Sequence, residues 1–193
     1  HILPRNARMG GSLLFDGAPL TPGRARALRG GEMALIPQGV TWLDPMMKVG
    51  AQLRQGRNDG ETRARCRAAL ARYGLGPETE ELYPFQLSGG MARRVLIASA
   101  VMGEPRLIVA DEPTPGLDVR AAGRILGHFR ELAEQGAGVL FITHDLELAL
   151  TVADKIVVFF RGETVEEVPA ARFLAGEGLT HPYTRALRQA MPE

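Results

Sequence analysis

Two adjacent acidic residues follow a short apolar run in the second half of the sequence. Residues 107–110 read Leu-Ile-Val-Ala and lead directly into Asp111 and Glu112. Such a run is typical of a parallel strand covered on both faces, and open α/β sheets bind ligands beyond the carboxyl ends of their strands. One carboxylate there could hold Mg²⁺, and the other could orient or deprotonate an attacking water. Two solvated acids at an ordinary strand end are the simpler alternative.

Other polar side chains end apolar runs in the same way. Gln38 follows residues 33–36 after one proline, and His144 follows residues 139–142 after one threonine. The carboxyl ends of parallel strands meet at one edge of a sheet, so these groups are expected near the two acids. A single glutamine or histidine at a strand end is usually an ordinary polar residue. Their shared position favours a phosphate site.

A serine followed by two glycines opens an amphipathic run that predicts a helix. Ser88 is a favoured N-cap residue, and Gly89 and Gly90 would form a flexible turn. The same residues also suit an anion, because two glycines let the backbone approach closely and a helix N-terminus carries positive charge.

Composition limits the function classes. The 23 basic and 22 acidic residues give a net charge of +1, which gives no electrostatic argument for nucleic-acid binding. The single Cys66 excludes a disulfide within the chain, and a metal site needs more ligands. No apolar run reaches the length of a membrane span, so membrane association has to come from partners.

The elements that must position these groups follow from periodicity and turn residues. Residues 11–37 predict short strands and a loop, and residues 39–103 predict mainly helices, including 61–73 and the helix after Ser88. Strands and helices then alternate, which predicts a parallel sheet with covering helices, before a hairpin turn and two short terminal helices. The expected later elements are strands 107–111, 138–143 and 156–160, helices 119–135 and 146–153, turn 161–163, strand 164–168, and helices 170–174 and 182–191.

The combined motifs resemble the nucleotide-binding subunit of an ABC transporter over nearly the whole chain. Leu87–Met91 resembles the signature motif, although Met91 stands where that family usually has glutamine. The other matched motifs are the Walker B strand with its catalytic glutamate at Leu107–Glu112, the D-loop at Pro115–Asp118, the switch histidine His144 and the Q-loop Gln38.

The resemblance implies an α/β P-loop NTPase (RecA-like) fold, in which a parallel sheet with covering helices is joined by an antiparallel β lobe and an α-helical signature lobe. A single ABC ATPase domain is then expected over residues 1–193. Its expected parts are the remainder of the β and core lobe (1–38), the helical lobe (39–103), the RecA-like core (104–168) and a helical tail (169–193).

The resemblance also implies roles for individual residues, with ATP and Mg²⁺ as the bound species. Glu112 would be the general base and His144 would bond the γ-phosphate. Asp111 and Gln38 would bind Mg²⁺. Ser88, Gly89 and Gly90 would contact a nucleotide held by a second ATPase subunit in a head-to-tail dimer, and Asp118 would lie at the dimer interface.

Finer features resemble the peptide and nickel importer branch. They are Leu43–Pro45, Val49–Gln52, Tyr83–Phe85 and His181–Leu187. This likeness implies an ATPase that powers import of peptides, nickel or metal chelates. It would sit peripherally on the cytoplasmic face of the inner membrane, beside transmembrane permease subunits, and would meet a solute-binding protein only indirectly.

The largest departure from that family is the absence of a Gly-x-x-x-x-Gly-Lys-[Ser/Thr] loop. The only lysines are Lys48 and Lys155, and each is followed by an aliphatic residue. Without the loop's backbone N–H groups and lysine, the chain as given is expected to bind ATP feebly and to be inactive alone. Because the sequence starts at His1 and residues 2–4 resemble the segment after that loop's helix, we expect a fragment rather than a degenerate subunit.

Two other functions stay open at this point. A non-transport ABC ATPase, such as a carbon–phosphorus lyase accessory subunit, has stretches similar to residues 88–91 and 116–119. A regulatory subunit that does not bind nucleotide is suggested only by the missing loop. Beside the Q-loop, Trp42, Met46 and Met47 suit a groove for a permease helix, although most such residues are core.

Overall fold

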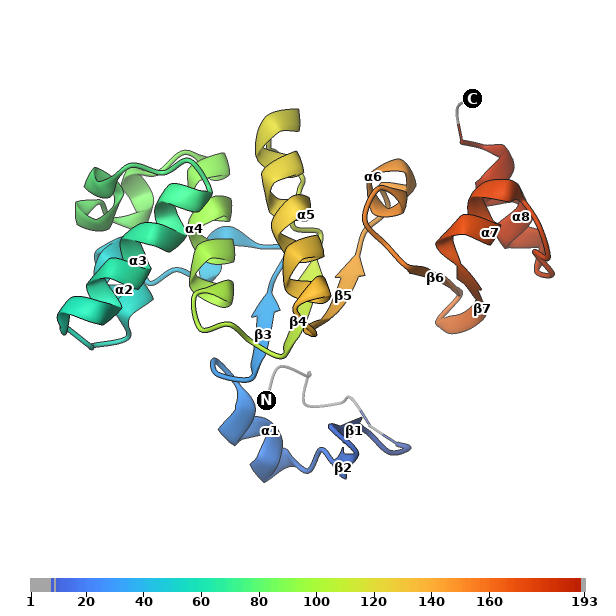
Figure 1. Cartoon of the computed structure of the whole chain (residues 1–193), viewed down its shortest axis with the longest axis horizontal. Helices are drawn as coiled ribbons and strands as arrows, with labels where there is room; N and C mark the ends of the chain where they lie inside the picture. The colour runs from blue at the N-terminus through green and yellow to red at the C-terminus, as the bar shows by residue number, and fades with distance from the viewer. Residues whose placement is uncertain (1–7, 9, 192–193) are drawn as a thin grey trace.

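The structure is a computed structural model that describes residue 8 and residues 10–191. The segment 2–4, discussed above, lies outside the described residues. Figure 1 shows an elongated molecule with helices at one end, a parallel sheet in the middle and a small antiparallel unit at the other end. The strands are β1 (Leu14–Phe15), β2 (Ala18–Pro19), β3 (Met33–Ile36), β4 (Leu107–Asp111), β5 (Gly138–Ile142), β6 (Lys155–Phe160) and β7 (Glu163–Pro169). The helices are α1 (Pro22–Leu28), α2 (Val49–Arg54), α3 (Gly60–Arg72), α4 (Gly89–Val101), α5 (Val119–Glu134), α6 (Leu146–Leu150), α7 (Ala170–Ala175) and α8 (Pro182–Gln189).

The central sheet is parallel and has the order β3-β4-β5. Ile36 of β3 lies opposite Ala110 of β4, and Asp111 lies opposite Ile142 of β5. The carboxyl ends of all three strands therefore meet at one edge, as the sequence predicts. The α/β class and the parallel sheet are confirmed.

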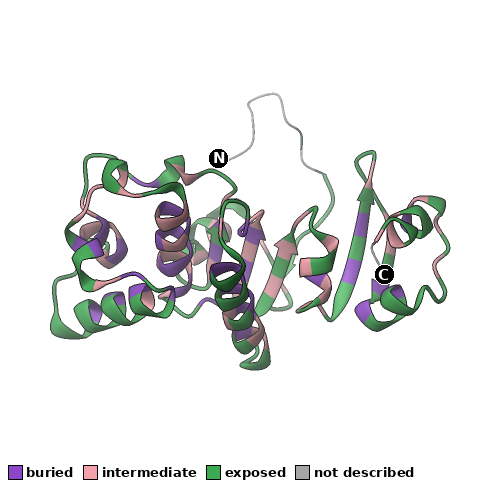
Figure 2. Ribbon diagram, turned by 90° about the horizontal axis from the view of Figure 1, so that it is seen from above, coloured by how far each residue is buried: buried purple, intermediate pink, exposed green. Residues whose placement is uncertain are grey.

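The two faces of this sheet differ in cover. Helix α5 presents Ile125 and Phe129 to the main core, which is coloured as buried in Figure 2. On alternate positions Leu35, Leu140 and Ile142 are 42%, 51% and 47% exposed. Parallel sheets are normally covered on both faces, so the described residues leave an apolar face of this sheet open.

Strand β6 corrects one sequence-based prediction. Residues 156–160 were expected within the alternating parallel pattern, but among the described residues β6 pairs with β7 alone, antiparallel, in a separate two-stranded sheet. Arg161 and Gly162 connect the strands with φ of 51° and 86°, the conformation that a two-residue hairpin turn requires. Side chains around the buried Phe173 form a second, smaller core there. The sequence predicted the hairpin turn, and with it the antiparallel pairing of β6 with β7, whereas it did not predict that β6 lies outside the parallel sheet.

Helix α1 occupies residues that the sequence analysis assigned to a loop. Its N-cap Thr21 accepts a hydrogen bond from the backbone N–H of Arg24, and Pro22 takes the first helical position. Both are ordinary helix-start signals. They were overlooked because the helix buries none of its residues and so shows no apolar stripe.

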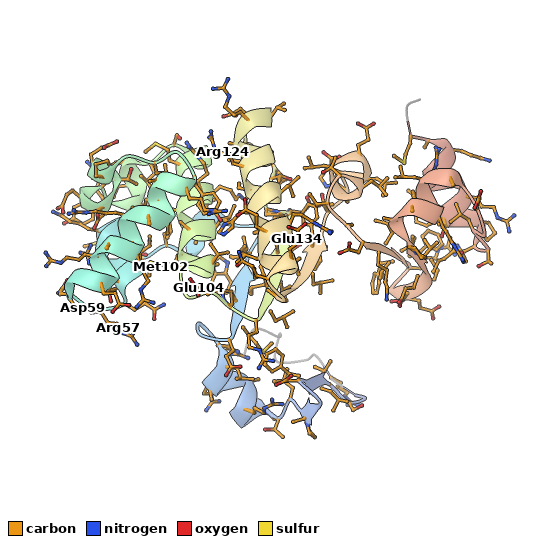
Figure 3. The ribbon with its side chains drawn as sticks, viewed as in Figure 1. Arg57, Asp59, Met102, Glu104, Arg124 and Glu134 are labelled. Carbon is orange, nitrogen blue, oxygen red and sulfur yellow. The ribbon has the colours of Figure 1, made fainter. Side chains whose placement is uncertain are left out.

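The helical segment contacts α5 through paired polar groups. The hydroxyl of the buried Tyr73, after α3, lies 2.5 Å from Nδ1 of His128, and Arg72 pairs with Glu131. Arg124 of α5 extends toward the helical segment (Figure 3), and its guanidinium lies beside Gly74, which follows α3. Burial, reinforced by Arg72, lowers the pKa of His128, so the ring is neutral near pH 7 and Nδ1 can accept a hydrogen bond from the Tyr73 hydroxyl.

Removal of this hydrogen bond should weaken the fold measurably. Tyr73→Phe deletes the donor and leaves a partly buried ring nitrogen without it, which should cost about 0.5–1.5 kcal/mol of unfolding free energy. Urea denaturation checks this value. Tyr183→Phe is the matched control, because the Tyr183 hydroxyl has no hydrogen bond among the described residues and its ring stacks on Phe160. Equal stability of both variants and wild type would contradict the prediction.

Candidate active site at the strand ends

Glu112 holds an unusual backbone conformation directly after β4. Its φ is 45°, a left-handed value that is uncommon for residues other than glycine and often marks functional sites. The backbone N–H of Glu112 donates to the carbonyl of Ile142 at 2.9 Å. This bond extends the β4–β5 ladder and turns the Glu112 side chain toward the end of β5.

The Glu112 carboxylate is bonded by the two residues after β5. Its Oε1 lies 2.6 Å from Nδ1 of His144 and accepts the His144 backbone N–H at 3.0 Å. Its Oε2 accepts the Thr143 hydroxyl at 3.2 Å. The Glu112 side chain is only 13% exposed, whereas that of His144 is 83% exposed. A buried, fixed carboxylate thus meets a histidine that is open to solvent.

These contacts shift the pKa values of the two groups in opposite directions. Burial acts to raise the pKa of Glu112, but the hydrogen bonds from His144 and Thr143 and the His144 charge outweigh it, and the net pKa is lowered. The hydrogen bond and charge of Glu112 raise the pKa of His144. The charged pair is therefore favoured at mildly acidic pH.

The pair should make stability depend on pH. The contribution of His144 to the free energy of unfolding is fully present at pH values below 6.5, the pKa of an unfolded histidine. It is lost as the pH rises through the raised pKa of His144 in the folded state. The contribution of Glu112 to the free energy of unfolding is present at pH values above 4.5, the pKa of an unfolded glutamate. It is lost as the pH falls through the lowered pKa of Glu112 in the folded state. Glu112→Gln should therefore destabilise the fold more at pH 5.5 than at pH 8.5, measured by urea denaturation at both values. Glu163→Gln, at an exposed hairpin turn, should show no such difference; an equal effect of Glu112→Gln at both pH values would refute the pairing.

Asp111 and Gln38 lie at the ends of adjacent strands. Asp111 is the last residue of β4, and Gln38 follows β3 by two residues with an exposed side chain. The described residues contain no group of three His, Cys, Asp or Glu side chains that could hold a metal alone. One carboxylate and one amide oxygen fit Mg²⁺, which keeps several waters and shares substrate phosphates. Softer metals with a full protein ligand set do not fit these residues.

Ser88 and Asp118 each cap a helix. Ser88 accepts the Met91 backbone N–H at 3.2 Å at the start of α4, and Asp118 accepts the Ala121 N–H at 2.8 Å at the start of α5. The two loops are neighbours, because a Cβ placed on Gly90 would lie 3.5 Å from the carbonyl oxygen of Gly116. Ser88, Gly89 and Asp118 are exposed. Both caps therefore present helix N-termini on one surface.

The predicted residues thus form two groups. Glu112 and His144 are in direct contact, with Asp111 and Gln38 at the same sheet edge. Ser88, Gly89 and Gly90 lie instead beside the loop that carries Asp118. Within the described part of the chain, no hydrogen bond joins a predicted residue of one group to a predicted residue of the other.

Two residues that contact this site were missed in the sequence. Thr143 bonds the Glu112 carboxylate, and Arg93 of α4 donates to the carbonyls of Pro37 and Glu112. The available signals were a hydroxyl next to His144 and an arginine on the apolar stripe of the α4 run. Neither signal reveals its partner without the fold.

Comparisons with known proteins agree with this arrangement. The family described as ABC transporter matches residues 2–115, more than half of the chain. A putative peptide import ATP-binding protein of Brucella abortus is 34% identical over 98% of this chain and 60% of its own length. A glutathione import ATP-binding protein of Salmonella typhimurium is 38% identical over 87% of this chain and 28% of its own length. The chain thus spans about 60% or less of these relatives.

Solved structures give the same result. A dimeric ATP-binding cassette in a post-hydrolysis state bound to ADP and Pi is 26% identical with a TM-score of 0.75, over 83% of this chain and 74% of that one. An ATP-bound bacterial Atm1-family ABC exporter is 26% identical with a TM-score of 0.76, over 95% of this chain and 33% of that one. Motifs, fold and family match together place this chain in the ABC transporter family.

Proposed function

We propose that this chain is part of an ATPase subunit that powers import of peptides, or of nickel or metal chelates, through a membrane transporter. The observation that carries the proposal is the Glu112 carboxylate, fixed by His144 and Thr143 at the end of a parallel strand and adjacent to Asp111. The import names of the compared relatives favour transport over a carbon–phosphorus lyase role or a purely regulatory one.

In this proposal, Glu112 orients the water that attacks the γ-phosphorus. Phosphoryl transfer needs placement and charge stabilisation more than covalent chemistry, and a largely buried carboxylate fixed by hydrogen bonds suits that task. Because Nδ1 of His144 faces Glu112, its Nε2 is left to donate to a γ-phosphate oxygen. Asp111 and Gln38 would hold Mg²⁺, which, when bound, neutralises charge on the phosphate oxygens.

A second ATPase subunit would complete the site. The exposed Ser88–Gly90 loop, at the N-terminus of the 13-residue helix α4, suits the phosphates of a nucleotide held by that subunit. Asp118, on the neighbouring loop, would lie at the interface between the two subunits. The compared dimeric cassette supports such a pair.

Hydrolysis in this scheme needs a glycine–lysine phosphate loop that these 193 residues do not contain. We propose that a further polypeptide segment supplies it. The open apolar face of the parallel sheet, with Leu35, Leu140 and Ile142, is consistent with additional chain packed there.

Permease subunits would provide the membrane connection. The described part of the chain has no helix that is long and apolar enough to cross a bilayer. Beside Gln38, Trp42 and Met46 are 60% and 83% exposed, and Phe85 on a nearby turn is 74% exposed. These side chains suit a helix from a permease at the cytoplasmic face of the inner membrane, with a solute-binding protein acting on the far side.

Reconstitution of the complete transporter tests the function. Vesicles with the ATPase subunits, permeases and solute-binding protein should couple ATP hydrolysis to uptake of a labelled dipeptide or of a nickel chelate. Omission of the subunit that carries this chain should abolish both activities. Hydrolysis or uptake that persists without it would overturn the proposal.

A further inference from the structure

Arg93 is a buried cation without an acidic partner in the part of the chain that the structure describes. It is 9% exposed, on the face of α4 that packs toward the sheet, and α4 lies beside β3 in Figure 1. Its Nε atom has no hydrogen-bond partner among the described residues. A buried charge is costly unless its surroundings compensate it, so a plain packing role is a poor explanation for an arginine here.

The guanidinium contacts two backbone carbonyls at the sheet edge. Its Nη1 donates to the carbonyl of Pro37 at 3.2 Å and to that of Glu112 at 3.1 Å. Pro37 directly precedes Gln38. One side chain of the helix that begins at the Ser88–Gly90 loop thus bonds the ends of β3 and β4. Arg93 is therefore the physical link between the two groups of predicted site residues.

The hydrogen bond from Arg93 also fixes the backbone carbonyl of Glu112. The Glu112 N–H is bonded to Ile142 of β5, and its carbonyl is bonded to Arg93 of α4. These two bonds hold the left-handed backbone of Glu112, which is strained for a residue with a side chain. Because the Glu112 carbonyl is bonded to α4, a shift of α4 along the sheet would act on the backbone that carries the carboxylate.

We infer that Arg93 is a positioning residue that couples the Ser88–Gly90 loop and helix α4 to the placement of the Glu112 carboxylate. The inference rests on the proposed ATPase function and adds to it a route by which a nucleotide bound at the signature loop affects the general base. Arg93 touches no reacting atom in this scheme. It acts through the backbone of Glu112.

The test uses the complete ATPase subunit that carries this chain, assembled with its partner subunits. Arg93→Met should lower kcat for ATP hydrolysis about tenfold or more, since misplacement of a catalytic group by about 1 Å can cost about a hundredfold, with little change in KM. Arg93→Lys keeps the charge but loses the fork of N–H donors, so it should also lower kcat with little change in KM, whereas a role of charge alone would leave kcat at the wild-type value.

Arg94→Met is the matched control. Arg94 is the next residue of α4 and also bonds backbone carbonyls, those of Gly90, Tyr73 and Gly74, but not that of Glu112. It should not reproduce the selective loss of kcat, whatever it does to stability. If Arg93→Met keeps the wild-type kcat while Glu112→Gln abolishes hydrolysis, the inference fails and the proposed function stands. If Glu112→Gln has no effect, the proposed function itself fails.

Discussion

Glu112→Gln should reduce ATP hydrolysis by the assembled transporter about 10²–10⁴-fold, the range that a positioned general base contributes. Glutamine keeps the size of the side chain but cannot accept a proton from water or pair with a charged His144. Binding of ATP should change little, because the carboxylate acts on the water rather than on the nucleotide. Steady-state hydrolysis and nucleotide binding, measured on the same preparation, separate the two effects.

Glu163→Gln provides the control for that measurement. Glu163 is an exposed residue at the β6–β7 turn, distant in the fold from the end of β4 (Figure 1). It should keep wild-type turnover. Undiminished hydrolysis in Glu112→Gln would remove the general base from the scheme.

Ser88→Arg should lower hydrolysis at the site whose phosphate loop belongs to the other subunit, by about 10²–10³-fold. Ser88 starts α4 and is exposed together with Gly89, and a large side chain there would block close approach of an anion to the helix N-terminus. Donors aimed at the charge that develops in a transition state are worth about that much.

The subunit in which the loss occurs is the decisive observation. Vanadate trapping of labelled nucleotide, followed by separation of the subunits, shows which chain holds the trapped label. Ser88→Arg in this chain should remove the label from the partner subunit, and Ser12→Arg, at another exposed serine, should not. Retention of the label on the partner would show that the Ser88 loop does not complete a site across the dimer.

Local sequence determined the elements and the strand ends with little error. Asp59, Ser88 and Asp118 each cap the helix that their sequence context predicted. These caps could be predicted because each side chain bonds a backbone N–H only three residues further along the chain. Likewise, Asp111, Glu112 and His144 could be placed at the ends of strands, since the apolar run that precedes each acid or histidine is contiguous. Their catalytic roles stay predictions.

The tertiary structure alone decided which segments meet. An apolar strand reads the same whether it lies inside or outside a parallel sheet, so the separation of β6 from the β3-β4-β5 sheet was not visible beforehand, although the hairpin turn predicted its pairing with β7. The link from Arg93 to Pro37 and Glu112 spans 56 and 19 residues, and that from Tyr73 to His128 spans 55. Such contacts depend on how helices and strands pack in space, whereas sequence pattern records only which faces are apolar. The sequence by itself thus determined the chemical groups and the elements that carry them, and packing decided their partners.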